Sequence, residues 1–438
     1  MRIEERLRAE RPTERANVTP PEEAWDSIRR RLDRGPRDGA RRVAAAVTAL
    51  VLAVAAIAVV VGAFGRRSVG PAGVWSNGDI LFTRLVSKGA HGMDDTALYS
   101  VRPDGSGLTR LTTGPGAVEE VAVSADGRRI AYVLQRESPA PDATGRQTQD
   151  AVYVIDRPGA IPRLLVQCHD LCANPAWSPD GRQIAFADEA SAYQGSDIEV
   201  VPADGGPVRT LCAVACGQGL SEPSWSPDGS RIAFSQLGVL VRMGLGIPPG
   251  SLWVVNADGS SLERITGATT CGSGRTCFLD VAPAWSPDGS TIAFDRIRAS
   301  FGPHARGVAG IYLLPVGGEA RLLWRCSSPY SCQSSAPQWS PDGSRLAFGT
   351  DGGPDVTVIA PDGSHERTIS LCSTPDCTLV SNVVWSPDGD RLAVTAFHGI
   401  GKQSDMIPQG LYLMGADGTG LHEVVSGQIG DVAWVPGG

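Results

Sequence analysis

A five-residue motif, Trp-Ser-Pro-Asp-Gly, recurs along the 438-residue chain. Each copy is followed, after two residues, by an apolar triplet such as Ile184-Ala185-Phe186. The copies are spaced by 46 to 60 residues, a period that is typical of solenoids, propellers and repeat arrays. The five copies are Trp177–Gly181, Trp225–Gly229, Trp285–Gly289, Trp339–Gly343 and Trp385–Gly389.

The motif has the composition of a tight turn. Pro presets φ for the second turn position, Asp bonds to its own backbone, and Gly accepts a left-handed conformation. The Trp therefore ends one strand, and the apolar triplet belongs to the next. A second turn, such as Asn256-Ala257-Asp258-Gly259, follows in most repeats. Each repeat is thus predicted to be a four-stranded antiparallel meander, and arrangement in a ring protects the edges of such sheets.

Incomplete repeats at the two ends decide the predicted number of units. Val123–Gly127 is a copy in which Val replaces Trp, and Val432–Gly437 is a first strand with no repeat behind it. Three further apolar runs, which lack a first strand, occupy residues 80–82, 98–101 and 108–111. The simplest interpretation is that the C-terminal strand completes the first unit and closes the ring.

The sequence therefore predicts an all-β, seven-bladed β-propeller over residues 75–438. Trp75-Ser76-Asn77-Gly78 competes with the C-terminal strand for the same place in the first blade. Six and eight blades remain alternatives for this reason.

The repeated motif and its Ile-Ala-Phe triplets resemble the WD-like propeller repeats of the TolB family. Similar repeats occur in the propellers of some prolyl-type peptidases. The resemblance covers residues 75–438 and implies the fold, whereas a fold alone does not imply a function. TolB proteins carry an α/β domain before the propeller, and nothing in this sequence matches that domain.

The segment before the propeller has the pattern of a membrane anchor. Residues 43–64 contain no charged side chain and are long enough to cross a bilayer as a helix. Residues 65–74 form a short linker to the propeller. Residues 1–42, before the span, contain 12 Arg and 9 acidic residues. The excess of Arg before the span predicts a single-pass cell-membrane protein with a cytoplasmic N-terminus and an extracytoplasmic propeller. A cleaved signal peptide is the alternative.

A short amphipathic helix is predicted within the cytoplasmic segment. Thr19-Pro20-Pro21-Glu22 has the pattern of a helix start, and Trp25, Ile28 and Leu32 form one apolar stripe. This stripe is either a docking site for a cytoplasmic regulator on residues 20–34 or a helix without a partner. The plan of cytoplasmic segment, single span and outer domain resembles that of bacterial anti-sigma proteins. Zinc-binding members of that class use His and Cys, and residues 1–42 contain neither.

The ten cysteines all follow the apolar span and fall into five local pairs. An even number of cysteines in an exported domain predicts disulfide bonds, whereas a structural zinc site needs four convergent ligands. Each pair lies between the last strand of one repeat and the next Trp motif. The predicted pairs are Cys168 with Cys172, Cys212 with Cys216, Cys271 with Cys277, Cys326 with Cys332, and Cys372 with Cys377.

Meander geometry assigns the connections to two faces. The short Asp-Gly turns share one face, and the Cys-bearing connections share the other with the long loops. Binding sites favour variable loops on a rigid scaffold, so the loop-rich face is the predicted site for an envelope protein or ligand. One loop has an apolar sequence, which either packs on the neighbouring blade or contacts a partner. Its candidate residues are Leu237, Val239, Leu240, Val241, Met243 and Leu245.

No catalytic motif is apparent, and the chain is predicted to be non-enzymatic without cofactor or metal. The Asp of each Trp motif is explained by its turn. Residues 68–438 carry a net charge of −13, since the chain totals −8 and the preceding part carries +5. This acidic character argues against a nucleic-acid partner. If the propeller acts as a lyase or hydrolase on carbohydrate or peptide, the first candidate residues are Arg296, Arg298, His304 and His398.

The function predicted first is thus a membrane-anchored, non-enzymatic binding module of the bacterial cell envelope. The alternatives are a transmembrane sensor, in which the propeller receives the input, and a propeller enzyme.

Overall fold

The computed structural model describes residues 74–88, 94–137, 148–169, 171–191, 195–212, 222–237, 250–267, 278–298, 310–326, 336–350, 353, 355–371, 377–398 and 407–437. The predicted cytoplasmic segment, the apolar span and nearly all of the linker lie outside these ranges. Within them, the structure contains no helix with the length and apolarity that crossing a bilayer requires.

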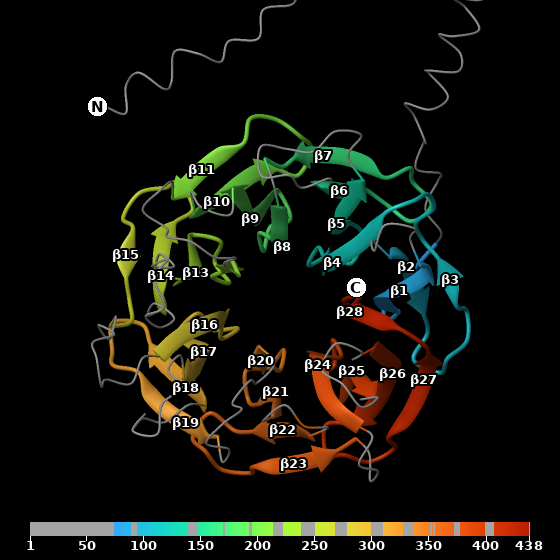
Figure 1. The fold of residues 1–438 in the computed structure, drawn as a ribbon. Coiled ribbons are helices and arrows are strands. Elements are labelled where there is room, and N and C mark those ends of the chain that lie inside the picture. Colours follow the sequence, from blue (N-terminus) through green and yellow to red (C-terminus); the bar gives the residue numbers. More distant parts are fainter. Residues whose placement is uncertain are drawn as a thin grey trace, which may run out of the picture. The chain divides into compact units, whose positions relative to one another are not determined.

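The described residues form seven four-stranded antiparallel sheets arranged as a ring (Figure 1). Blade 1 contains, from the ring axis outward, β28 (Ile429–Trp434), β1 (Ile80–Ser87), β2 (Asp95–Val101) and β3 (Thr109–Arg110). Blade 2 contains β4 (Ala117–Val123), β5 (Ile130–Glu137), β6 (Thr148–Ile155) and β7 (Arg163–Gln167). Blade 3 contains β8 (Leu171–Trp177), β9 (Gln183–Ser191), β10 (Gly195–Pro202) and β11 (Arg209–Cys212).

The other four blades repeat the same order. Blade 4 contains β12 (Ser224–Trp225), β13 (Arg231–Leu237), β14 (Gly250–Asn256) and β15 (Glu263–Arg264). Blade 5 contains β16 (Phe278–Trp285), β17 (Thr291–Arg298), β18 (Gly310–Pro315) and β19 (Arg321–Arg325). Blade 6 contains β20 (Gln338–Trp339), β21 (Leu346–Thr350), β22 (Asp355–Ile359) and β23 (Arg367–Ser370). Blade 7 contains β24 (Cys377–Trp385), β25 (Arg391–His398), β26 (Ile407–Gly415) and β27 (His422–Ser426).

The C-terminal strand closes the ring, as predicted. Strand β28 pairs with β1 in antiparallel register, with Ile80 opposite Trp434 and Phe82 opposite Val432. Seven blades are thereby confirmed. The alternative first strand at residues 75–78 is wrong, because β28 occupies that place. The indole of Trp75 is instead buried between blades 1 and 2.

The core lies between neighbouring blades. The Ile-Ala-Phe triplet of blade 3 is fully buried, and its Ile184 and Phe186 pack with Trp177 against Val152 and Val154 of blade 2. The repeat Trp also joins blades by a hydrogen bond. Its indole N–H donates to a carbonyl of the preceding inner strand at Trp177, Trp225, Trp339 and Trp385. In blade 5, the indole nitrogen of Trp285 is buried without an acceptor among the described residues.

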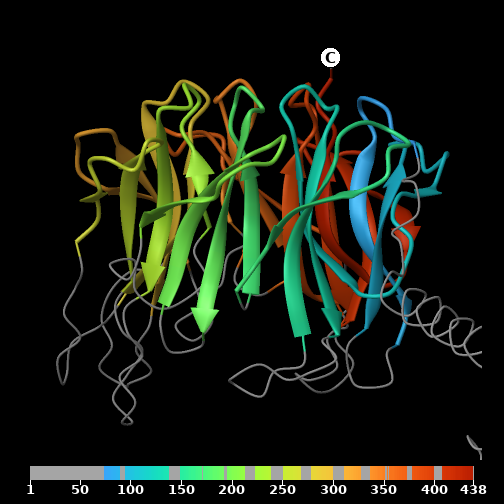
Figure 2. The ribbon, with the colours of Figure 1, turned by 90° about the horizontal axis from the view of Figure 1, so that it is seen from above.

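The two faces of the ring differ in their connections. On one face, here called the turn face, short turns join strands three and four of each blade and, in blades 2 to 7, strands one and two. The C-terminal end lies on this face (Figure 2). The opposite ends of the strands form the loop-rich face. In blade 2, for example, the β5–β6 pairing extends from Ile130 opposite Ile155 to Glu137 opposite Thr148 on that face. The predicted distribution of connections is confirmed for the described strands.

Candidate functional site

The Asp of each Trp motif acts within its own turn. In blade 3, the Ser178 hydroxyl and the Arg182 amide both donate to Asp180 Oδ1, and the Gly181 amide donates to Ser178 O at 2.8 Å. Gly181 has φ of 67°, a left-handed conformation that glycine adopts without strain. The predicted turn is therefore confirmed. Among the described residues, no group of three or more His, Cys, Asp or Glu side chains is arranged to hold a metal ion.

These hydrogen bonds favour the charged form of the turn aspartates. Hydroxyl and amide donors lower the pKa of Asp228 and of Asp342 to about 2. The pKa is lowered in the same way at Asp126, Asp180, Asp288 and Asp388. The turn face thus carries a repeated pattern of exposed carboxylates that stay ionised in neutral and mildly acidic solution.

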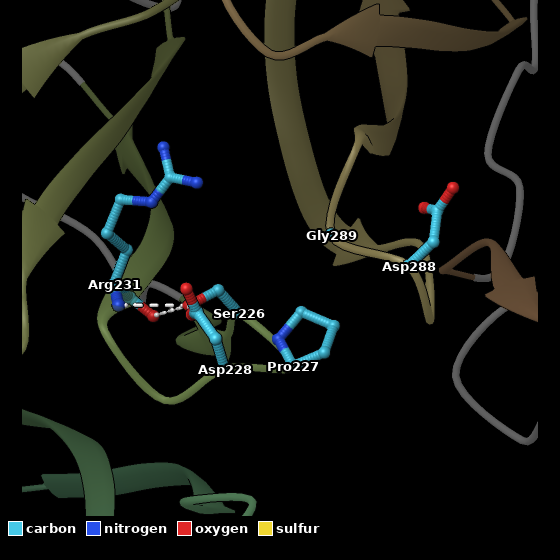
Figure 3. A pocket seen from close by; sticks show the side chains of 6 residues that line it. All are labelled: Ser226, Pro227, Asp228, Arg231, Asp288 and Gly289. Atoms are coloured by element: carbon cyan, nitrogen blue, oxygen red, sulfur yellow. Dashed lines mark hydrogen bonds between the residues drawn. The ribbon is translucent and has the colours of Figure 1, made fainter.

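A pocket of about 330 Å³ lies between the turns of blades 4 and 5 (Figure 3). Ser226, Pro227, Asp228 and Arg231 line it from blade 4, and Asp288 and Gly289 line it from blade 5. The guanidinium of Arg231 stacks over Trp285 at 4.9 Å. Because both carboxylates already accept bonds from serine hydroxyls of their own turns, the pocket is explained by the junction of two turns.

A second set of carboxyl groups lies on the inner strands or just before them, and these strands surround the ring axis (Figure 1). The set occupies the position three residues before the repeat Trp or its Val substitute. Glu120 and the equivalent Asn174 have positive φ, 47° and 53°, and both interrupt the register of their strands. The seven equivalent residues are Asp431, Glu120, Asn174, Glu222, Ala282, Ala336 and Asn382.

The three acidic members, here called the axial carboxyl groups, are partly buried. Each accepts a hydrogen bond from a backbone amide of the inner strand of the next blade. Asp431 Oδ2 accepts the Val121 amide of blade 2 at 2.6 Å, and Glu120 accepts the Asn174 amide of blade 3. Glu222 accepts the backbone amide of Ala282, but its Oε2 atom is buried without a partner among the described residues. The axial carboxyl groups thus hold adjacent blades together.

Burial raises the pKa of each axial carboxyl group. The pKa of Glu120 rises to about 8, first through desolvation and then through the nearby charges of Asp431, Glu119 and Glu222. Desolvation raises the pKa of Asp431 to about 6 and raises that of Glu222. The sequence prediction missed this set. Its fixed position before the repeat Trp was the available signal.

The loop-rich face carries the imidazole of His169, which a buried carboxylate holds in place. His169 lies in the loop closed by the Cys168–Cys172 disulfide, and its Nδ1 is 2.9 Å from Asp188 Oδ2. The imidazole is 72% exposed, whereas the carboxylate is 3% exposed. The bond to Asp188 raises the pKa of His169, and burial raises that of neighbouring Glu199. A side chain oriented in this way offers its Nε2 atom to a ligand in solvent.

Arg296 is the predicted candidate whose side chain the structure describes. Its guanidinium forms a two-bonded ion pair with Asp280, at 2.6 and 2.8 Å, and stacks over Tyr312 at 4.4 Å. Asp280 is 1% exposed. Arg296 is thus tied into blade 5 near its loop-rich end.

The other predicted site residues are not placed by the structure. Leu237, Arg298 and His398 end strands β13, β17 and β25, but their side chains lie outside the description. The remaining candidates also lie outside the described residues, and they are Val239, Leu240, Val241, Met243, Leu245, His304, Trp25, Ile28 and Leu32.

The structure confirms one predicted disulfide, Cys168–Cys172. Cys212 and Cys326 are also disulfide-bonded, and their predicted partners, Cys216 and Cys332, lie outside the described residues.

Two predicted disulfides stay predictions. Cys271 and Cys277 both lie outside the described residues, so the structure does not place the bond predicted between them. Cys372 also lies outside the described residues, and Cys377 begins β24 with a side chain that is not described.

Comparison with known proteins gives one family match. Residues 129–301 match the model of the TolB β-propeller domain. An uncharacterised protein of Agrobacterium fabrum is 29% identical over 202 residues, which are 46% of this chain and 61% of the relative. The chain thus spans about three fifths of the length of the curated relative that it matches.

Solved structures share the fold. A puromycin-hydrolysing peptidase of Mycobacterium tuberculosis is 17% identical with a TM-score of 0.54, covering 84% of this chain and 54% of the peptidase. TolB of Acinetobacter baumannii is 16% identical with a TM-score of 0.44, covering 82% and 83% of the two chains. At such identities the likeness concerns the fold alone. The repeats, the seven blades and the match over residues 129–301 together show a β-propeller that resembles the TolB β-propeller domain.

Proposed function

We propose that the chain is a membrane-anchored, extracytoplasmic binding module that receives an envelope protein or ligand on its loop-rich face. The observation that carries the proposal is the difference between the two faces. The turn aspartates bond within their own turns, whereas the loop-rich face presents the exposed imidazole of His169 on a disulfide-closed loop anchored by Asp188. A rigid support beneath an exposed polar group is the arrangement that a binding site needs.

A non-enzymatic role fits this site better than catalysis. The His169 ring bonds to Asp188, and no Ser, Thr or Cys nucleophile bonds to the ring within the described ranges. A general base needs its nucleophile within hydrogen-bond reach. Structures with this fold include peptidases and an oligogalacturonate lyase, but the fold does not carry their chemistry to this chain.

The experiment is a crosslinked recovery of partners from membranes that contain the full-length chain. His169→Ala is compared with His422→Ala, because His422 is also exposed but lies beside the turn face with its Nδ1 atom 2.7 Å from Gly420 O. Recovery of the envelope partner is expected to fall about fivefold or more for His169→Ala, since truncating a central contact costs about 1 kcal/mol or more. Equal recovery from both variants would exclude the His169 loop as the site.

A second candidate function, a transmembrane sensor, is favoured by the place where the chain enters the ring. Trp75 follows the linker and is buried against blade 2, where its Nε1 donates to Gly127 O at 3.0 Å. A change in the propeller that displaces Trp75 would therefore act on the chain that directly precedes it. If this function holds, a cytoplasmic partner is recovered with the intact protein and lost on deletion of residues 1–42 or with Trp25→Ala. Recovery of the same proteins by all three forms would contradict it.

A further inference from the structure

The place where β28 closes blade 1 and packs beside blade 2, here called the seam, differs from the rest of the ring. Strand β28 is joined to β1 by hydrogen bonds alone, whereas covalent turns connect the first two strands of every other blade. A strand without a covalent turn to its neighbour in the sheet is where a ring opens at the lowest free energy.

Blade 2 also lacks the motif Trp with which other blades pack on the blade before them. Val123 stands in its place, and the indole of Trp75 packs instead in the cluster with Val121, Tyr132 and Val435. Trp75 is 3% exposed, and its Nε1 donates to a blade 2 carbonyl. The N-terminal segment therefore supplies an indole hydrogen bond between blades of the kind that four of the five intact motifs supply for themselves.

The same segment holds the end of the closing strand. The Gly78 amide donates to Val435 O at 3.1 Å, and the Val435 amide donates to Asp79 O at 2.9 Å. The indole of Trp434 donates to Gly78 O at 3.0 Å. Because β28 and residues 75–79 hold each other, release of one weakens the attachment of the other.

We propose that residues 74–79 are a latch on the seam, which couples closure of the propeller ring to the chain that precedes it. The inference deepens the sensor candidate, on which its signalling role rests, by naming the physical connection between propeller and N-terminal chain. Opening of the seam frees β28 and Trp75 together, and a partner that binds the closed ring keeps the latch engaged.

Gly127, in the first turn of blade 2, lies where that turn meets the latch and the end of the closing strand. A methyl group added there would lie 3.0 Å from Asn77 Oδ1 and 3.1 Å from both Pro436 O and Val435 Cγ1. The equivalent Gly343 has nearly the same φ, 70° against 68°, but a methyl group there would meet only Pro287, at 3.5 Å from its Cδ. The two positions share their backbone strain and differ in contact with the latch, so they provide a matched pair.

The test is amide hydrogen exchange of the full-length protein, read by peptide. Trp75→Ala is compared with Trp225→Ala, since Trp225 makes the equivalent bond to Ala176 O between blades 3 and 4. Trp75→Ala is expected to speed exchange in β28 and residues 74–79 about tenfold or more while β13 and β17 keep wild-type rates. Trp225→Ala should not expose β28 selectively.

Gly127→Ala provides an independent variant, and it should speed exchange in β28 more than Gly343→Ala does. Wild-type protection of β28 in both seam variants, or equal exposure of β28 in their controls, would overturn the latch. Exchange is measured without any cytoplasmic partner, so the latch can stand while the sensor function fails. If the latch is confirmed and Trp75→Ala leaves recovery of a cytoplasmic partner unchanged, the sensor function alone is excluded.

Discussion

The turn aspartates and the axial carboxyl groups accept the same kind of hydrogen bond, yet their pKa values move in opposite directions. Asp342 accepts the backbone amide of Ser344 on the turn face, and Asp431 accepts that of Val121 near the axis. The pKa of Asp342 falls to about 2, whereas that of Asp431 rises to about 6. The difference shows that an amide donor stabilises a carboxylate only where water is not removed at greater cost.

The two sets also differ in what they hold together. Asp342 bonds within five residues of chain, so its turn forms locally from sequence. Glu120 and Asp431 bond across blade boundaries, between residues that lie far apart in sequence. The turn aspartates therefore shape the turn within each repeat, and the axial carboxyl groups connect one repeat to the next.

The largest expected effect is a fall in stability as pH rises through neutrality. The folded pKa of Glu120, about 8, exceeds its ordinary value of 4.5, so the folded protein retains a proton that the unfolded chain releases. The free energy of unfolding therefore falls between pH 4.5 and 8, by at most about 5 kcal/mol from this residue at about 1.4 kcal/mol per pKa unit. Urea unfolding across pH measures the slope.

Glu120→Gln should flatten that slope, because Gln keeps a carbonyl acceptor and does not ionise. Glu263→Gln on β15 is the control, since Glu263 is exposed and is not among the charges that raise the pKa of Glu120. If both variants retain the wild-type slope between pH 5 and 9, the pKa of Glu120 is not raised, and the contrast between the turn aspartates and the axial carboxyl groups is wrong.

A smaller effect of opposite sign is expected on the turn face. Asp342→Ala removes the acceptor for Ser340 and Ser344 and should cost about 1 kcal/mol at pH 7, a value reduced for solvent exposure. Because the pKa of Asp342 is lowered from 3.8 to about 2, this contribution should vanish as pH falls below 3.8 towards 2. Thermal unfolding at pH 7 and pH 2.5 provides the comparison.

Asp204→Ala is the matched control for the turn prediction. The Asp204 carboxylate is 93% exposed and lies 3.5 Å from Arg129 in a surface ion pair, an interaction worth little. An equal loss of stability in the two variants would show that the hydrogen bonds of the Trp motif have no special role.

The smallest effect tests whether side chains beside the turn aspartates add to the stability of the turn face. Arg231→Gln removes the guanidinium stacked on Trp285 and should cost about 0.5–1 kcal/mol at neutral pH. Arg182→Gln is the control, because that side chain is 85% exposed and lies 3.9 Å from Asp180. Denaturant unfolding that gives equal values for the two would assign the stability of these turns to the aspartates alone.

The sequence by itself determined the repeats and the turns and predicted seven blades, whereas the β28–β1 pairing decided between seven and the alternatives of six and eight. Trp-Ser-Pro-Asp-Gly encodes a local hydrogen-bonded turn, and the unpaired first strand at the C-terminal end predicted the closure by β28. Such features are readable because the atoms that interact lie within a few residues, or because the same pattern recurs at each repeat.

Only the tertiary structure decided the role of Trp75, the axial carboxyl groups and the pairing of His169 with Asp188. Trp75 looked like part of a strand, but its indole fills the space that Val123 leaves between blades. Glu120 looked like an ordinary polar strand residue until ring closure brought its charge near those of Asp431 and Glu222. These outcomes depend on desolvation and on contacts between distant segments, and neither exists before the ring closes.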